Sequence, residues 1–234
     1  MYDVIFISYH EPNAEENYEN LYERFNQVGL YGERVKRISN VKGIHNAHVE
    51  AAKLASTDYF FVVDGDAVIV DGFDFSYTTK VKGMVHVYRC MNPINDLVYG
   101  YGGVKLFPTA LTRNMDTNTN DMTTSISKNF KVINEIANIT AFNTDPFNTW
   151  KSAFRECAKL SSKTIDRQKE EETNERLKTW TTVGHDRQYG EYCLAGATAG
   201  MEFGLSRGSD LRLINDFEWI REKFNGNAYN IRPL

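Results

Sequence analysis

Residues 59–70, which read YFFVVDGDAVIV, decide the fold of this chain. Five consecutive aromatic or β-branched residues, 59–63, predict a strand that is buried on both faces, as in a parallel sheet. Asp64 and Asp66 follow where this strand ends, and that edge is where open α/β sheets bind their ligands. Two carboxylates about 4 Å apart repel each other by roughly 4 kcal/mol at an effective dielectric constant of about 20. A divalent cation on oxygen ligands offsets that repulsion, so we interpret the stretch as a candidate metal site. Gly65 lets the backbone bend between the carboxylates, and a plain polar turn is the alternative interpretation.

The residues before this stretch predict a β-α-β-α-β order. Apolar or β-branched runs predict strands over 4–7 and over 34–38, the second at a sheet edge. Helical spacing predicts a helix over 15–27, and Asn46 is expected to cap another over 47–55. We therefore expect an α/β protein with a mostly parallel central sheet of the nucleotide-binding type, flanked by helices.

The second part of the chain is less regular. We expect strands over 85–89 and 97–107, and a long mobile loop over the polar segment 112–129. Asp145 and Pro146 predict a helix start, as N-cap and first helical residue. The charged segment 162–178 is expected to be a solvated helix or exposed arm, and 211–224 an amphipathic helix. The sequence has no internal repeat and no clear domain boundary.

Composition, net charge and cysteine content limit the classes to which this protein can belong. Of 234 residues, 41% are hydrophobic and 25% charged, as in soluble globular proteins. A net charge of −4 excludes a uniformly basic nucleic-acid binder but leaves a local basic face open. Three cysteines without a C-x-x-C pattern indicate reduced thiols in a cytosolic protein. We find no secretion signal or membrane-spanning run, expect a cytoplasmic location without membrane partners, and infer no oligomeric state.

A half-sheet that ends in Asp-x-Asp resembles the GT-A glycosyltransferases. In that family Mn²⁺ or Mg²⁺ bridges the second Asp to the diphosphate of a nucleotide sugar, while the first Asp faces the ribose or sugar. The chain is similar, more narrowly, to glycosyltransferases of large tailed phages, over segments 2–9, 63–67, 92–108, 150–157 and 196–197. Some of that group resemble enzymes that glycosylate hydroxymethylated pyrimidines of phage DNA, including an arabinosyl-transferring type. The resemblance implies one GT-A-like domain over 1–234, with a nucleotide-sugar half (1–108) and an acceptor half (109–234), in the host cytoplasm if the chain is phage-encoded.

The resemblance also assigns roles to residues by position. The implied metal ligands are Asp66 and Asp64, with His185 and Asp186 late in the chain. A surface histidine and a turn or helix cap are the alternatives for the last two. For the general base that an inverting enzyme needs, the candidates are Glu156, Asp145 and Asp96. A plain solvent-facing glutamate is the alternative for Glu156, and an enzyme that retains configuration needs none of the three.

Donor-binding residues are expected to cluster at strand ends and glycine-rich segments. They are Ser8, Tyr9, Glu11, Lys42, Gly43, Asp64, Gly65, Gly102, Gly103, Gly196 and Ala197. A rim tyrosine is the alternative for Tyr9, a simple bulge for the glycine pair 102–103, and tight helix packing for the pair 196–197. The remaining histidines have no metal-binding spacing, so we interpret them as structural: His10, His45, His48 and His86.

The expected activity is the metal-dependent transfer of arabinose, or another pentose or hexose, from a UDP-sugar to 5-hydroxymethylcytosine in phage DNA. DNA binding requires a basic surface, and the candidates are Arg34, Lys36, Arg37, Lys42, Lys80 and Lys82, with loop 112–129 as a clamp. A solvated face of mixed charge is the alternative for these cations. The alternative functions are a glycosyltransferase acting on a glycan, lipid or protein, and a non-catalytic module that binds a nucleotide sugar or nucleic acid.

Overall fold

A computed structural model describes residues 1–27, 32–100, 102–119, 122–163, 168–206 and 210–228 of the chain. It confirms the α/β class. The chain forms two compact units, Met1–Met91 with Val98–Ala141, and Asn92–Leu97 with Phe142–Leu234. The expected division at residue 108 falls at the end of a strand inside the first unit. That residues 1–234 form a single domain therefore stays a prediction, and each unit is described by itself.

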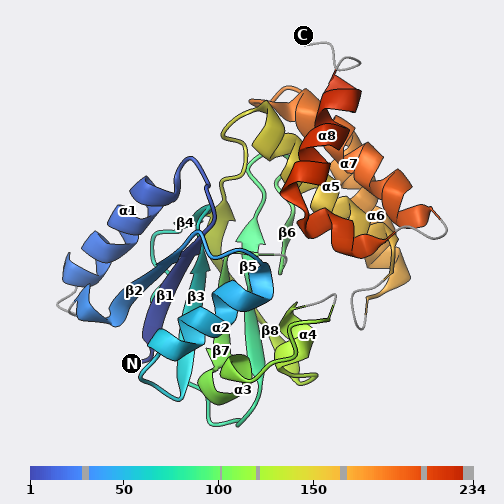
Figure 1. The fold of residues 1–234 in the computed structure, drawn as a ribbon. Helices are drawn as coiled ribbons and strands as arrows, with labels where there is room; N and C mark the ends of the chain where they lie inside the picture. The colour runs from blue at the N-terminus through green and yellow to red at the C-terminus, as the bar shows by residue number, and fades with distance from the viewer. Residues whose placement is uncertain (28–31, 101, 120–121, 164–167, 207–209, 229–234) are drawn as a thin grey trace. The chain divides into compact units, whose positions relative to one another are not determined.

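The first unit is built on one mixed sheet (Figure 1). In the described residues its strand order is β2-β1-β3-β7-β5-β8-β4, and β6 pairs with β5. The pairs of β1 with β2 and β3, and of β5 with β8, are parallel, whereas the pairs of β7 with β3 and β5, and of β4 with β8, are antiparallel. The strands are β1 (Asp3–Ser8), β2 (Val35–Ser39), β3 (Tyr59–Asp64), β4 (Ala67–Ile69), β5 (Val85–Met91), β6 (Val98–Tyr99), β7 (Val104–Pro108) and β8 (Phe130–Thr140).

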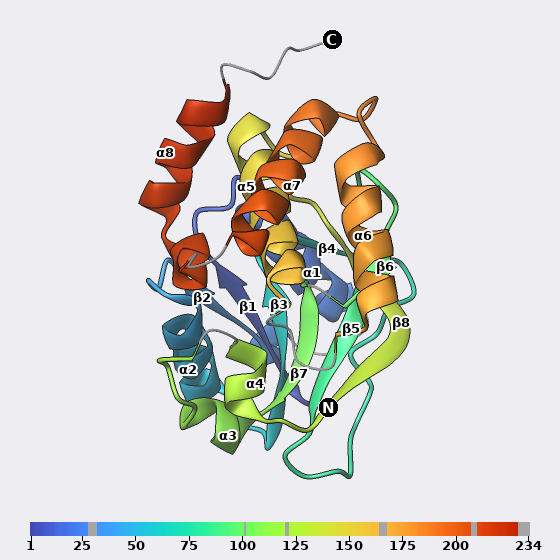
Figure 2. The ribbon, with the colours of Figure 1, turned by 90° about the vertical axis from the view of Figure 1, so that its right-hand side faces the viewer.

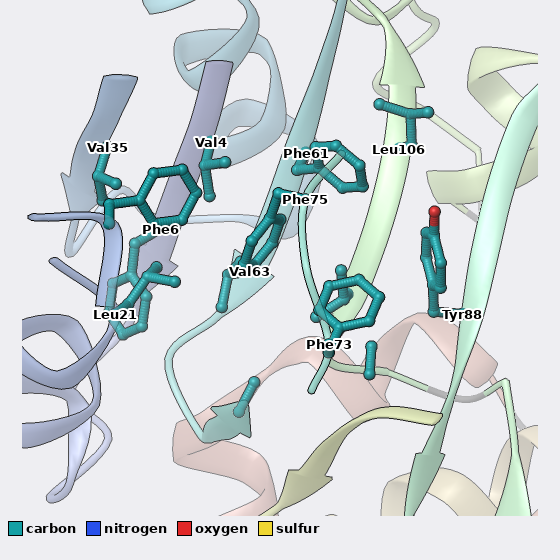
Figure 3. Close-up of a cluster of buried hydrophobic side chains, with 14 of the residues drawn as sticks. Val4, Phe6, Leu21, Val35, Phe61, Val63, Phe73, Phe75, Tyr88 and Leu106 are labelled. Atoms are coloured by element: carbon teal, nitrogen blue, oxygen red, sulfur yellow. The ribbon is translucent and has the colours of Figure 1, made fainter. Parts of the chain in front are cut away.

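Alternating side chains of the sheet enter two cores. Val4, Phe6, Phe61 and Val63 pack with α1 (Ala14–Gln27) in one core, which Figure 3 shows. Their neighbours in sequence along β1 and β3 pack with α2 (Ile44–Leu54) in the other. Burying a large apolar side chain contributes about 1.5–3 kcal/mol, so these two cores fix β1 and β3 in the middle of the unit. The predicted β-α-β-α-β order, with β2 at the sheet edge, is confirmed.

The cap that we expected for α2 is wrong. The helix begins at Ile44, and its N-cap is Gly43, with a φ of +90° that glycine adopts easily. Asn46 lies inside the first turn, where its Nδ2 donates to the carbonyl of Lys42 at 3.2 Å. The helix therefore starts three residues earlier than the apolar spacing indicates.

The expected mobile loop over 112–129 is also wrong in its described part, which excludes residues 120–121. The segment contains α4 (Met122–Ile126) and the end of α3 (Thr109–Arg113). Met115, Met122 and Ile126 are buried in the core under α2. Three apolar residues spread through a polar segment are sufficient to dock it, although its composition is typical of a loop.

Two further strand assignments change. The strand expected over 97–107 is split into β6 and β7, with residue 101 between them lying outside the described residues. The sequence analysis missed β8 because much of it is polar and exposed, and its pairing with β5 shifts register between Tyr88 and Cys90. Apolar runs mark buried strands, so a half-exposed strand is missed by that signal.

The second unit is helical. Its helices are α5 (Pro146–Ser161), α6 (Glu170–Thr182), α7 (Gly190–Leu205) and α8 (Phe217–Ala228), with a 3₁₀ turn over Leu211–Asn215. α7 packs against both α5 and α6 (Figure 2).

The N-cap predicted at Asp145 is confirmed, since its side chain accepts a hydrogen bond from Asn148 N at 2.9 Å. The single helix expected over 211–224 is wrong, because Asp216 begins a new helix by accepting from the amides of Glu218 and Trp219. In the part of the chain that the structure describes, no helix is both long and apolar enough to cross a bilayer.

Candidate functional site

Three strand ends meet at one edge of the sheet in the first unit. β1 and β3 are parallel, so Ile7 lies opposite Asp64 and both strands end together. β7 runs the other way, so its start at Val104 lies opposite Val63. The amide of Asp64 donates to the carbonyl of Gly103 at 2.9 Å, which ties the Asp-x-Asp segment to the glycine pair before β7. The structure thus places four predicted site residues on three neighbouring strand ends: Ser8, Asp64, Gly65 and Gly103.

Asp64 is held by two donors from the β7 side. Its Oδ2 accepts from the ammonium of Lys105 at 2.9 Å and from the amide of Gly103 at 3.0 Å. Its side chain is 31% exposed. Burial pushes the pKa of Asp64 up, but Lys105, His48 and these hydrogen bonds outweigh burial, so the pKa lies below its ordinary value. Asp64 is therefore ionised at neutral pH and stabilised by an ion pair in the protein.

Lys105 contacts the candidate site through Asp64, and the sequence analysis did not identify it. It lies in β7 between apolar neighbours and is only 9% exposed. A buried ammonium needs a partner, because its desolvation is costly. The signal was present in the sequence as one lysine inside the otherwise apolar run 104–108, but such a run also fits a strand with one exposed face.

His48 lies under this pair on α2. Its Nδ1 is 2.7 Å from the carbonyl oxygen of Ile44, so Nδ1 carries the proton, and the buried Nε2 has no hydrogen-bond partner in the described residues. Burial lowers the pKa of His48 to about 4. The ring also contacts Phe107 at a centroid distance of 5.6 Å. Its burial and its contact with Phe107 agree with the structural role expected for it, and it is uncharged at neutral pH.

The close approach of β1 leaves little room for a side chain at Gly65. A Cβ at this position would lie 2.6 Å from Oε2 of Glu11 and 3.0 Å from Cβ of Ser8. Glu11 is fixed there, because the amide of Tyr9 donates to its Oε2 at 2.5 Å. The carbonyl of Gly65 accepts from Nδ2 of buried Asn17 at 2.9 Å. The predicted donor residues Ser8 and Glu11 therefore contact the acidic turn directly.

Asp66 lies in the turn between β3 and β4 and is half-buried. Its carbonyl accepts from the amide of Ala141 at 2.7 Å, which fixes the backbone on the far side of Gly65. His185 and Asp186 are exposed residues of the second unit, in the turn before α7. In the described ranges, no group of three or more His, Cys, Asp or Glu side chains is arranged to hold a metal ion. The four-residue ligand set therefore stays a prediction.

The other predicted donor residues have different surroundings. Gly103 has a φ of +82°, and a Cβ there would lie 1.9 Å from Oδ1 of Asn138, so packing alone requires glycine. A Cβ on Gly102 would lie in ordinary contact, 3.8 Å from Oδ2 of Asp64. Lys42 is exposed beside the helix cap Gly43, and Tyr9 is a half-buried residue whose ring contacts His10.

In the second unit, Gly196 faces α5, where a Cβ would meet the carbonyl of Trp150 at 2.3 Å, and Ala197 is fully buried. Helix packing is enough to explain a small residue at both positions, and a donor-binding role for the pair 196–197 stays a prediction.

The three base candidates belong to the second unit. Glu156 is 5% exposed and pairs with Lys159 at 2.9 Å, so the solvent-facing alternative is wrong. Asp145 caps α5. Its burial raises the pKa, but hydrogen bonds from Asn148, Thr144 and Phe147 outweigh that effect and lower it. Asp96 is exposed and pairs with Arg187 at 3.3 Å. A catalytic role for each of them stays a prediction.

Part of the expected basic surface is neutralised by nearby carboxylates. Lys36 and Arg34 lie 3.0 and 3.7 Å from the carboxylate of Asp3, and Arg37 lies 2.7 Å from that of Glu15. The exposed residues Lys42, Lys80 and Lys82 remain. Around β2, the alternative of a mixed-charge face describes the surface better.

Comparison with known proteins gives matches among solved structures and none by sequence. The sequence matches no protein-family model and no curated protein. Among solved structures it is similar to HddC from Yersinia pseudotuberculosis, with 12% identity over 58% of this chain and 92% of that chain, and a TM-score of 0.40. A glycosyltransferase involved in the glycosylation of the major capsid of PBCV-1 matches 56% of this chain and 82% of its own, with 14% identity and a TM-score of 0.35.

A third similar structure is the mannosyltransferase PcManGT from Pyrobaculum calidifontis in complex with GDP-Man and Mn²⁺. The match covers 97% of this chain and 84% of that one, with 12% identity and a TM-score of 0.40. At these TM-scores and identities the likenesses carry no argument about activity. What this chain does is therefore argued from its own residues.

Proposed function

We propose that this chain is a metal-dependent glycosyltransferase that uses a UDP-sugar. The observation that supports it best is the acidic turn 64–66, at the edge where β1 and β3 end together and β7 begins. Ligands bind at this edge in open α/β sheets, and two carboxylates flanking a glycine are suited to a hard divalent cation. The residues at this edge also provide a serine (Ser8), a third acidic side chain (Glu11) and backbone groups of a glycine pair.

The two carboxylates of the turn have different roles in this proposal. Asp64 is already paired with Lys105, so it is suited to hydroxyl groups of the donor rather than to the cation. Asp66 is the residue that would hold Mn²⁺ or Mg²⁺, and this fits its carboxylate chemistry. When bound, the ion stabilises negative charge on the departing diphosphate, an effect worth several kcal/mol. Ser8 and Glu11 position the donor from the β1 side.

The acceptor in this proposal is the hydroxymethyl group of 5-hydroxymethylcytosine in phage DNA, and the sugar is arabinose or another pentose or hexose. Support comes from the resemblance of the segments 92–108 and 150–157 to glycosyltransferases of large tailed phages, some of which are similar to enzymes that glycosylate phage DNA. A base in a duplex must leave the stack to react, at a cost of a few kcal/mol. Of the six basic residues predicted to meet DNA, three pair with carboxylates, and the proposal assigns the contact to the exposed residues Lys42, Lys80 and Lys82.

Two assays test the proposal. The purified protein with Mn²⁺ should release UDP from UDP-arabinose or UDP-glucose when hydroxymethylated DNA is present. Mass spectrometry of nucleosides should then show a pentose or hexose on hydroxymethylcytosine and none on unmodified DNA. UDP release without a mass gain on DNA would move the proposal to a glycan, lipid or protein acceptor. Nucleotide binding without turnover on any acceptor would leave a binding module instead.

A further inference from the structure

Lys105 is placed where a strand residue would ordinarily be apolar. The other residues of β7 are Val104, Leu106, Phe107 and Pro108, all buried. Replacing a buried ion pair by apolar residues is often neutral or stabilising, so such a pair is weak evidence for a role in stability. The Lys105–Asp64 pair lies at the sheet edge beside Gly65 and the glycine pair 102–103, which is the edge assigned to the donor.

Hydrogen-bonding capacity remains on both partners. An ammonium has three N–H groups, and in the described part of the chain Asp64 is the one acceptor for Lys105 Nζ. Oδ2 of Asp64 takes both of its hydrogen bonds, and no described residue donates to Oδ1. The pair therefore presents N–H donors next to a carboxylate acceptor on a partly exposed side chain.

A hydroxyl group matches this arrangement. It donates one hydrogen bond and accepts up to two, so it can donate to a carboxylate and accept from an adjacent ammonium. A phosphate oxygen accepts only, and the negative charge of Asp64 disfavours it. Charge-assisted hydrogen bonds of this kind are about twice as strong as neutral ones.

We propose that Lys105 is a specificity-determining residue that, together with Asp64, binds a hydroxyl group of the sugar nucleotide, on the ribose or on the transferred sugar. This inference rests on the proposed function. It gives Lys105 a direct contact with the donor, whereas the roles of Asp64 and Asp66 belong to the proposed function.

The test is titration calorimetry in Mn²⁺ buffer with UDP-glucose, UDP and inorganic pyrophosphate. Lys105→Met should weaken UDP-glucose binding at least tenfold and leave pyrophosphate within twofold. If the hydroxyl is on the ribose, UDP weakens as much as UDP-glucose; if it is on the transferred sugar, UDP stays within twofold. The matched control is Lys36→Met, which breaks the Lys36–Asp3 pair (3.0 Å) in the same sheet and should leave all three affinities within twofold.

In Lys105→Met the Asp64 carboxylate loses its ion-pair partner, and this alone could destabilise the fold. A second variant therefore controls for misfolding. Asp64→Asn with Lys105→Met removes both charges together, and it should also bind UDP-glucose at least tenfold more weakly. Unchanged UDP-glucose affinity in either variant would overturn the inference, as would an equal loss of pyrophosphate binding or an equal effect of Lys36→Met. If the wild-type protein binds neither UDP nor UDP-glucose, the proposed function itself fails, and this inference with it.

Discussion

Asp3 and Asp64 are two carboxylates at opposite ends of the same pair of parallel strands, and their surroundings differ. Asp3 is 2% exposed. Its Oδ2 accepts from the amide of Ser56 at 2.6 Å, the hydroxyl of Ser56 at 2.8 Å and the ammonium of Lys36 at 3.0 Å. Asp64 accepts from one ammonium and one amide, through a single oxygen, and is 31% exposed.

The difference separates a carboxylate that is satisfied within the protein from the one that we propose to bind the donor. At the start of β1, the protein itself supplies the donors that Asp3 needs, and two basic residues balance its charge. At the end of β3, glycines replace side chains around Asp64, and its side chain accepts two hydrogen bonds where that of Asp3 accepts three. In both residues the hydrogen bonds go to Oδ2, but Oδ1 of Asp3 faces Arg34 at 3.7 Å in a side chain that is 3% exposed, whereas the side chain of Asp64 is 31% exposed. Both aspartates pair with a lysine, so the exposure of the carboxylate, and not the ion pair, is what distinguishes the candidate site.

The largest effect is expected from Asp66→Ala, which removes the proposed cation ligand from the end that contains the site. A cation that stabilises the diphosphate by about 4 kcal/mol accelerates transfer about 10³-fold. We expect UDP release to fall by about that factor, measured as kcat/KM with saturating hydroxymethylated DNA. Asp3→Asn, compared at equal concentration of folded protein, should retain the wild-type rate. Similar losses in both variants would contradict the division between the two ends.

Asp3→Asn should instead act on stability. Breaking one partner of a buried, hydrogen-bonded ion pair costs about 4 kcal/mol of unfolding free energy. Burial raises the pKa of Asp3, but hydrogen bonds from Ser56 and the Lys36 ammonium lower it below 3.8 overall. The stabilisation is therefore present above pH 3.8 and is lost as the pH falls through the folded pKa. Urea unfolding between pH 7 and pH 2 should show the wild type and Asp3→Asn converging at low pH; a constant difference would contradict this account.

At the Asp64 end of the strand pair, the titration of His48 should make the folding stability depend on pH in a different pH range. Its pKa is about 4 in the folded chain and 6.5 in the unfolded one, so its contribution to stability is present above pH 6.5 and is lost as the pH falls toward 4. The loss is about 3 kcal/mol at pH 4. His48→Leu keeps an apolar contact with Phe107 and should flatten the urea-unfolding profile in this window. A profile as steep as that of the wild type would show that His48 is not the titrating group.

Gly65→Ala tests how closely β1 approaches the acidic turn. The new Cβ would lie within 2.6 Å of Glu11 Oε2, which is the end of a flexible side chain and can move. We expect a cost of about 1 kcal/mol in unfolding free energy, of the size found when a core is overpacked. UDP affinity should fall several-fold, because Glu11 leaves the amide of Tyr9. Unaltered affinity would remove Glu11 from the donor site.

The sequence predicted the fold where the hydrophobic pattern was strong. The run 59–63, the first strand and the Asp145 cap were each identified from local chemistry. Asp64, Gly65, Ser8 and Glu11 were four of the eleven predicted donor-binding residues and lie together in the structure, and their binding of a donor stays a prediction. The burial of Lys105 and the hydrogen bonds that Asp64 accepts from Lys105 and Gly103 depend on β7 pairing antiparallel to β3, which no local pattern encodes. Met115 and Ile126 were missed for a related reason, since isolated apolar residues in a polar segment show their role only after docking. Contacts between strands that are distant in sequence were therefore the part that could not be predicted.

The most direct test of the central claim is paramagnetic broadening of backbone amide signals by Mn²⁺ in the presence of UDP. We predict that the amides of residues 64–66 and of Gly103 broaden at substoichiometric Mn²⁺, whereas those of Asp3 and Ser56 stay sharp. Asp66→Ala should abolish the broadening at residues 64 and 65. Equal broadening at both ends of the strand pair, or none at residues 64–66, would contradict the assignment of the acidic turn as a cation and sugar-nucleotide site.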